Sequence, residues 1–129
     1  MIEAVSTAID TDSSGDATVY LGTRLRGRLH AIKYEPGTIA TGGDLTITGE
    51  TTGVPILVKA NAGTSDVWFY PRELVSLHTS GADATDAFAD IYAVRERIKV
   101  VVAQGGATKS GTISAYIDTP APYCHVLPG

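Results

Sequence analysis

The sequence predicts an all-β domain, either a β-sandwich or a jelly roll, of about seven or eight strands with at most one short helix. Three observations lead to this prediction. Short runs alternate apolar and polar residues with the two-residue period of a half-buried strand. Turns rich in glycine and proline separate these runs, and the chain holds 14 Gly and 6 Pro. Lysine and glutamate are few whereas threonine is abundant, which favours strands and tight turns over helices.

Length and charge narrow the possible protein classes. A chain of 129 residues is expected to form one domain, 1–129, with a core that needs no disulfide. The single cysteine, Cys124, has no partner for a disulfide within the chain. The net charge of −4 argues against a protein built for bulk contact with nucleic acid or membrane. No signal peptide is expected at the N-terminus, and no stretch approaches the roughly 20 apolar residues of a membrane helix.

In the first half of the chain, alternation and turns predict five strands, at residues 2–9, 17–22, 24–34, 44–49 and 54–60. Within 44–49, Leu45 and Ile47 are expected on one face, and Thr46 and Thr48 on the other. Proline lacks a backbone donor, so Pro55 is expected at the start of its strand or in a strand at the edge of a sheet.

In the second half, strands are predicted at 66–70, 94–103 and 111–118, with a hairpin-type loop at 104–110. Residues 82–92 are ambiguous. Apolar residues recur there at helical spacing, so a short helix or a loop is predicted; these are Ala84, Ala87, Phe88 and Ile91. The two ends are expected to extend from the domain, as an N-terminal strand or arm within 1–16 and a Pro-rich tail at 119–129.

The run at 66–70 carries the only tryptophan. Packing two sheets together requires large apolar side chains, so Trp68 is predicted to lie in the core. Because neighbouring strand residues point to opposite faces, the outer face exposes either Val67 and Phe69 or Trp68 and Tyr70. An exposed aromatic pair would suit an interface or a platform for sugars.

The stretch from Asp10 to Asp16 partly matches a calcium loop. Asp10, Asp12 and Ser14 occupy ligand positions and Gly15 the glycine position, but the bidentate glutamate position falls on Leu21. A solvated turn between two strands is therefore predicted, with calcium binding as the alternative. The three histidines and Cys124 have no metal-ligand spacing, and Asp83, Asp86 and Asp90 are expected on the solvated face of the possible helix. No cofactor, metal site or catalytic group is predicted.

An arginine stripe, defined as Arg24, Arg26 and Arg28, is the main candidate for a binding site. Residues two apart share a strand face, so these guanidinium groups are expected to project together and to repel one another unless anions lie opposite. The stripe is interpreted either as a solvated face paired with local carboxylates or as a contact surface for an acidic partner protein. Nucleic acid is a weaker alternative, because no exposed aromatics are interleaved with the arginines.

Three segments together resemble a known class. GRLHAIKYEPGTIATGGDLTITGETTGVPILVKA, DVWFYPRELV and RIKVVVAQGGATKSGTISAYI are similar, in the order of their strands and turns, to the small β-sandwich virion proteins of tailed bacteriophages. The resemblance covers about residues 19–118. It implies a capsid decoration (cement) protein that binds the major capsid protein on the outer shell as a trimer or dimer. It carries over no binding residue.

The expected function is therefore structural and not enzymatic. The protein is expected to be made in the host cytoplasm and to reside on the capsid surface, bridging capsid subunits, with no nucleic-acid or membrane partner. A tail, fibre or head–tail connector component is the alternative within the same class. A carbohydrate-binding β-sandwich module is the alternative from another class, and an enzyme such as a cupin-like jelly roll is disfavoured because the histidines are scattered.

Overall fold

The computed structural model of the chain describes residues 2–119, without the side chains of 23–25 and 92–95. Within that range it is all-β and contains no helix, which confirms the predicted fold class. The nine strands are β1 (Ile2–Asp10), β2 (Ala17–Glu35), β3 (Asp44–Gly49), β4 (Pro55–Lys59), β5 (Val67–Phe69), β6 (Arg72–Ser76), β7 (Asp83–Asp90), β8 (Tyr92–Ala103) and β9 (Ser110–Asp118).

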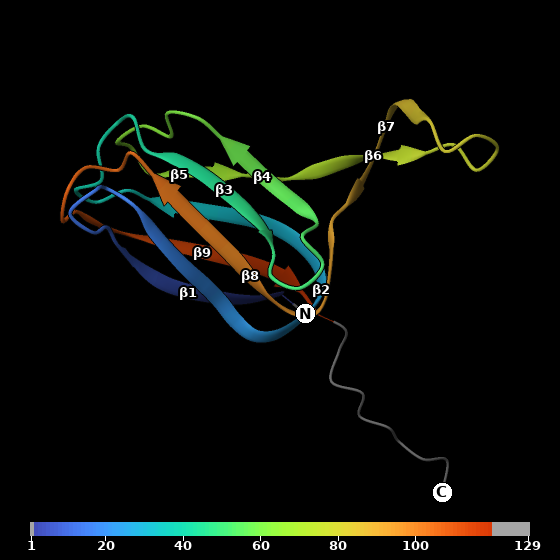
Figure 1. Cartoon of the computed structure of the whole chain (residues 1–129). Coiled ribbons are helices and arrows are strands. Elements are labelled where there is room, and N and C mark those ends of the chain that lie inside the picture. Colours follow the sequence, from blue (N-terminus) through green and yellow to red (C-terminus); the bar gives the residue numbers. More distant parts are fainter. Residues whose placement is uncertain (1, 120–129) are drawn as a thin grey trace, which may run out of the picture.

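The long strand β2 belongs to two sheets (Figure 1). Residues 17–28 pair with β8, whereas residues 28–35 pair with β9 and, through 32–34, with β5. Two antiparallel sheets result, ordered β1–β9–β2–β5 and β2–β8–β3–β4. The pairing is nested: β1 with β9, the first half of β2 with β8, its second half with β5, and β3 with β4. Nested antiparallel pairing over two sheets is the jelly-roll arrangement.

Two glycines allow β2 to turn from one sheet into the other. Gly22 has a φ of 70° and Gly27 a φ of 137°, both in the region that L side chains avoid. A Cβ on Gly27 would lie 2.4 Å from the carbonyl oxygen of Asp118. The prediction of separate strands at 17–22 and 24–34 was therefore wrong, because the backbone passes through the bend as one irregular strand with register shifts after Leu21 and Leu25.

The core lies between the two sheets and is made of the inward-facing residues of both. Leu45 and Ile47 are fully buried while Thr46 is exposed, as the alternation predicted. Pro55 begins β4, which is an edge strand, so both predicted placements of this proline hold. The other fully buried apolar residues of large volume are Ile9, Leu21, Leu29, Ile32, Ile39, Ile98, Val100, Ile113 and Ile117.

A buried carboxylate on β8 stabilises the turn between β3 and β4. Glu96 Oε1 accepts hydrogen bonds from the amides of Thr51 at 2.8 Å and Thr52 at 3.0 Å, and Oε2 accepts one from Thr52 Oγ1 at 2.8 Å. The backbone hydrogen bond from Thr52, with the further bonds, lowers the pKa of Glu96 although burial opposes this effect. The group acts as a structural cap for residues 49–53.

Tyr34 contrasts with Glu96. Its side chain is fully buried in the core, and its hydroxyl has no hydrogen-bond partner within the described residues. Desolvation raises the pKa of this phenol. Its ring therefore serves the packing of the core, whereas its hydroxyl costs stability.

Two predictions for the second half of the chain were wrong. Residues 83–90 form strand β7 and not a helix, because Phe88 is exposed and Asp86 adopts a φ of 56°, so neither an apolar helix face nor helical backbone exists there. Trp68 lies on the outer face of β5, with Val67 and Phe69 packed against the core. Residues 120–129 of the predicted tail, among them Cys124 and His125, lie outside the described residues.

Candidate interaction site at the projecting hairpin

Strands β6 and β7 form a hairpin that leaves the sandwich between β5 and β8 and projects away from it (Figure 1). Arg72 lies opposite Asp90, Leu74 opposite Phe88, and Ser76 opposite Asp83. At the tip, Leu77 N donates to Ala82 O at 2.7 Å. In the described part of the chain, β6 and β7 pair only with each other, so both edges of the hairpin are open.

The hairpin exposes apolar side chains that have no core to enter. Leu74 and Phe88 are direct cross-strand partners, and their exposed fractions are 38% and 62%. Val75 and Leu77 are exposed as well. A two-stranded hairpin is marginally stable in water without a packed face, so an apolar cross-strand pair on one suggests contact with another chain.

Between this apolar pair and the tip, the hairpin is irregular. Only Val75 separates Leu74 from Ser76 on β6, whereas residues 84–87 separate Asp83 from Phe88 on β7. Asp86 lies in this bulge with positive φ, a conformation that aspartate tolerates better than most residues. The irregular end of the hairpin thus presents two exposed carboxylates, Asp83 and Asp86.

The root of the hairpin is tied to the sandwich through Arg72. Its Nε lies 2.9 Å from Asp90 Oδ1, across the two strands. Its Nη1 donates to the carbonyl oxygens of Pro71 at 2.7 Å and of His30, on β2, at 3.3 Å. Leu29 N also donates to Ile91 O at 2.8 Å, which joins the end of β7 to β2.

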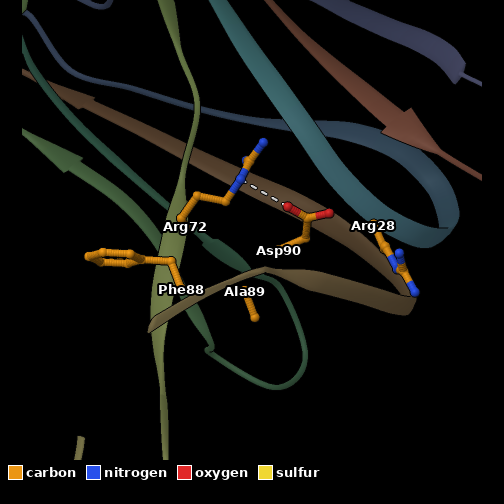
Figure 2. Close-up of a pocket in the computed structure, with 5 residues that line it drawn as sticks. All are labelled: Arg28, Arg72, Phe88, Ala89 and Asp90. Atoms are coloured by element: carbon orange, nitrogen blue, oxygen red, sulfur yellow. Dashed lines mark ion pairs between the residues drawn. The ribbon is translucent and has the colours of Figure 1, made fainter. Parts of the chain in front are cut away.

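An open hollow of about 500 Å³ lies where the root meets the bend of β2. Figure 2 shows the ion pair of Arg72 and Asp90, with Arg28 at the bend of β2 on one side of it and the ring of Phe88 on the other side, pointing away from Arg28. Ala89 completes the lining. The hollow thus combines one paired and one further guanidinium with an exposed aromatic ring.

The arginine stripe therefore lies at the bend of β2, next to the hairpin. Arg26 and Arg28 are exposed, and within the described residues neither forms an ion pair with a carboxylate. The side chain of Arg24 lies outside the described residues. Register shifts at Leu25 interrupt the regular alternation on which the shared face was predicted. Sequence reasoning found these arginines but missed the hairpin that lies beside them.

Residues 10–16 form the predicted turn. Asp12 Oδ1 accepts hydrogen bonds from the amides of Ser14 at 2.8 Å and Asp16 at 3.1 Å. The backbone hydrogen bonds from Asp16 and Ser14 lower the pKa of Asp12. In residues 2–119, no group of three or more His, Cys, Asp or Glu side chains is arranged to hold a metal ion. The predicted loop at 104–110 also joins two strands, β8 and β9.

A second exposed surface, the aromatic face, lies on the outer side of the β5–β2–β9 sheet and consists of Trp68, Tyr70, Tyr116, Lys33 and His30. Trp68 is 43% exposed and Tyr70 59%. The rings of Trp68 and Tyr116 have centroids 5.0 Å apart, and Lys33 Nζ lies 5.5 Å from the centroid of Trp68. His30 meets Tyr70 edge-on at 6.4 Å. The exposed pair is thus Trp68 and Tyr70.

Comparison of the chain with protein-family models, with curated proteins and with solved structures found no significant match. No helix long and apolar enough to cross a membrane occurs in the range 2–119. The hairpin and the aromatic face are the two candidate interaction surfaces of the described residues.

Proposed function

We propose that the protein is a structural component of a tailed-phage virion, a capsid decoration protein that binds the outer shell and bridges capsid subunits. The projecting hairpin β6–β7 is the observation that carries the proposal. It extends the chain away from its own core and presents Leu74 and Phe88 to solvent. Such an element serves contact with other chains, since its burial within the monomer is slight.

The body of the protein supports the same role. A two-sheet jelly roll with a continuous core is a rigid platform, and jelly rolls are frequent among viral capsid and lectin domains. Fold alone does not define function. The resemblance to small β-sandwich virion proteins adds the setting, and the exposed Arg26 and Arg28 add cationic groups for an acidic partner surface. Arg24 belongs to the same proposed contact set.

The test is binding to shells of the phage that encodes the protein. Purified protein is mixed with shells that lack it, and co-sedimentation and the thermal resistance of the shells are measured. A matched variant replaces 73–89 by Asn-Gly, a two-residue turn that joins the cross-strand partners Arg72 and Asp90. We expect wild-type protein to bind and stabilise shells, and the shortened variant to fold but bind more weakly.

Absence of wild-type binding to such shells would contradict the proposal. Cryo-electron microscopy of intact particles separates the decoration role from its alternative. Density in the tail, a fibre or the head–tail connector, with none on the capsid surface, would assign the protein there instead.

The aromatic face favours a second candidate, binding of carbohydrate. Sugars stack on exposed aromatic rings, and Trp68 and Tyr116 form a tilted ring pair on one sheet face beside Lys33. A glycan array, run with and without chelator, tests this function with Trp68→Ala as the matched loss-of-binding variant. Binding that the variant abolishes would support it, and an empty array under both conditions would remove it.

A further inference from the structure

The chemistry of the hairpin changes in order along its length. Its root meets the bend of β2, where Arg26 and Arg28 are exposed. Its middle carries the apolar pair Leu74 and Phe88. Its irregular end carries Asp83 and Asp86. Apart from the paired Arg72 and Asp90 and the exposed Glu73 near the root, the order from root to tip is therefore cationic, apolar and anionic.

Within the described residues neither Arg26 nor Arg28 forms an ion pair, although Asp118 lies opposite Arg28 on β9 and Asp90 lines the same hollow. The hairpin points away from the sandwich, so its tip does not reach the arginines at its own root (Figure 1). Among the described residues, neither carboxylate near the tip forms an ion pair, and the only ion pair of the hairpin is that of Arg72 and Asp90. The free groups at the two ends are opposite in sign.

We propose that two copies of this chain pair through their hairpins, side by side and in opposite directions. This antiparallel arrangement places the tip of each hairpin, with Asp83 and Asp86, in the hollow beside Arg28 of the other copy. It also brings Leu74 and Phe88 of both copies together near the axis. The same surface meets itself, which is the requirement for a closed two-fold dimer. A parallel arrangement would instead oppose like charges.

The proposal accounts for three features at once. The apolar pair gains a partner of its own kind, which removes its exposure to water. The arginines gain carboxylates, which relieves their mutual repulsion. The open edges of β6 and β7 come within reach of a second ribbon, and more strands give a hairpin the support that it lacks alone. That this dimer bridges capsid subunits through its two jelly-roll bodies rests on the function proposed above. The pairing itself does not rest on that function.

Sedimentation of charge-reversed variants tests the pairing. One variant, R26E/R28E, makes the root anionic. The other, T79K/D83K/D86N, makes the tip cationic, with Asn at position 86 because it tolerates positive φ. Each variant alone opposes like charges, so we expect its dimer dissociation constant to rise about tenfold or more. In an equal mixture every root faces an oppositely charged tip, and we expect heterodimers with affinity restored to within about threefold of wild type.

Two controls keep the result specific. The variant K59E/K109E changes net charge by the same amount as R26E/R28E, at exposed positions away from the hairpin, and is expected to dimerise as wild type. Circular dichroism confirms that each variant is folded. If the reversed variant is not, R26Q/R28Q is measured alone and is expected to weaken the dimer; an unchanged dissociation constant would then overturn the pairing. Wild-type dimers are also expected to weaken as salt is raised.

A monomeric wild-type protein at all accessible concentrations would overturn the pairing, as would a mixture that stays monomeric although both variants are folded. Failure of the pairing and failure of the proposed function are distinguishable. Shell binding by a strict monomer would reject the dimer and keep the decoration role. Hairpin-dependent dimers that ignore shells would keep the dimer and reject that role.

Discussion

The jelly-roll body and the β6–β7 hairpin use the same residue types for opposite purposes. In the body, Leu45 is fully buried between the two sheets, whereas Leu74 in the hairpin is 38% exposed and its partner Phe88 is 62% exposed. The body therefore has what its own folding requires. The hairpin has apolar surface that stays exposed in the monomer, and the proposed contact with another chain would bury it. If the proposed role of the hairpin holds, stability and interaction are assigned to separate regions of this sequence.

Carboxylates show the same division. Glu96 in the body accepts three hydrogen bonds from the turn that it caps. Asp83 and Asp86 in the hairpin are exposed and make no ion pair with any described residue. Substitutions in the body should therefore change the free energy of unfolding, and those in the hairpin should change association.

The largest effect is expected from matched leucines. Leu45→Ala removes a fully buried side chain and should lower the free energy of unfolding by about 2–5 kcal/mol. Leu74→Ala should lower it by only about 1 kcal/mol in the monomer, since its side chain is already 38% exposed. Urea unfolding at low protein concentration measures both. Equal costs at the two positions would show that the hairpin belongs to the folding core.

Next come two glycines with positive φ. Gly27→Ala at the bend of β2 would place a Cβ 2.4 Å from Asp118 O, so we expect a loss of about 3 kcal/mol from strain and backbone displacement. Gly53→Ala has no atom within 4 Å of the new Cβ. It should cost only about 1 kcal/mol, from its positive φ. Thermal unfolding of the two variants compares them, and equal shifts would refute the tight bend.

Glu96→Gln should lower the free energy of unfolding by about 1–3 kcal/mol at neutral pH, because it removes charge-assisted hydrogen bonds. The pKa of Glu96 is lowered in the folded protein, so its contribution is present above the unfolded pKa and is lost as pH falls through the folded pKa. The difference between wild type and variant should therefore shrink on acidification. Glu73→Gln in the hairpin is the control. A difference that grows on acidification would contradict the assignment.

The smallest effect is expected at Tyr34. Removing its unpartnered hydroxyl with Tyr34→Phe should leave stability unchanged or raise it by up to about 1 kcal/mol, because the buried polar atom has no hydrogen bond to lose. Urea unfolding measures the change. A loss above about 1 kcal/mol would mean that the hydroxyl is bonded in solution.

The body was largely predictable from the sequence because alternation and turn residues act locally. The alternation at 44–49 predicts that Leu45 and Ile47 face the core, and the missing backbone donor of Pro55 predicts its place in an edge strand. The bend in β2 was not predictable, because Gly27 is required there by the approach of Asp118, a residue far along the chain. Trp68 was misplaced because size favours burial, but register with Lys33 puts it on the outer face.

The hairpin was not predictable from the sequence because its strands lack a buried face. Alternation marks a strand only when one face is buried, and neither face of the hairpin is buried in the monomer. Apolar residues recur there at helical spacing, namely Ala84, Ala87, Phe88 and Ile91. They do not form one buried face, because Ile91 is buried at the root whereas Phe88 is exposed. The arginines were recognisable as an unusual stripe. That they lie beside the hairpin could be known only from the tertiary structure.

The most direct test of the division between body and hairpin is sedimentation velocity on the double variant Leu74→Ser/Phe88→Ser, with Val58→Ser, on the exposed edge strand β4, as the control. We predict that wild type and V58S sediment as dimers and the double variant as a monomer, with the circular dichroism of all three alike. A double variant that stays dimeric, or one that loses its β-sheet spectrum, would contradict the separation of folding from assembly.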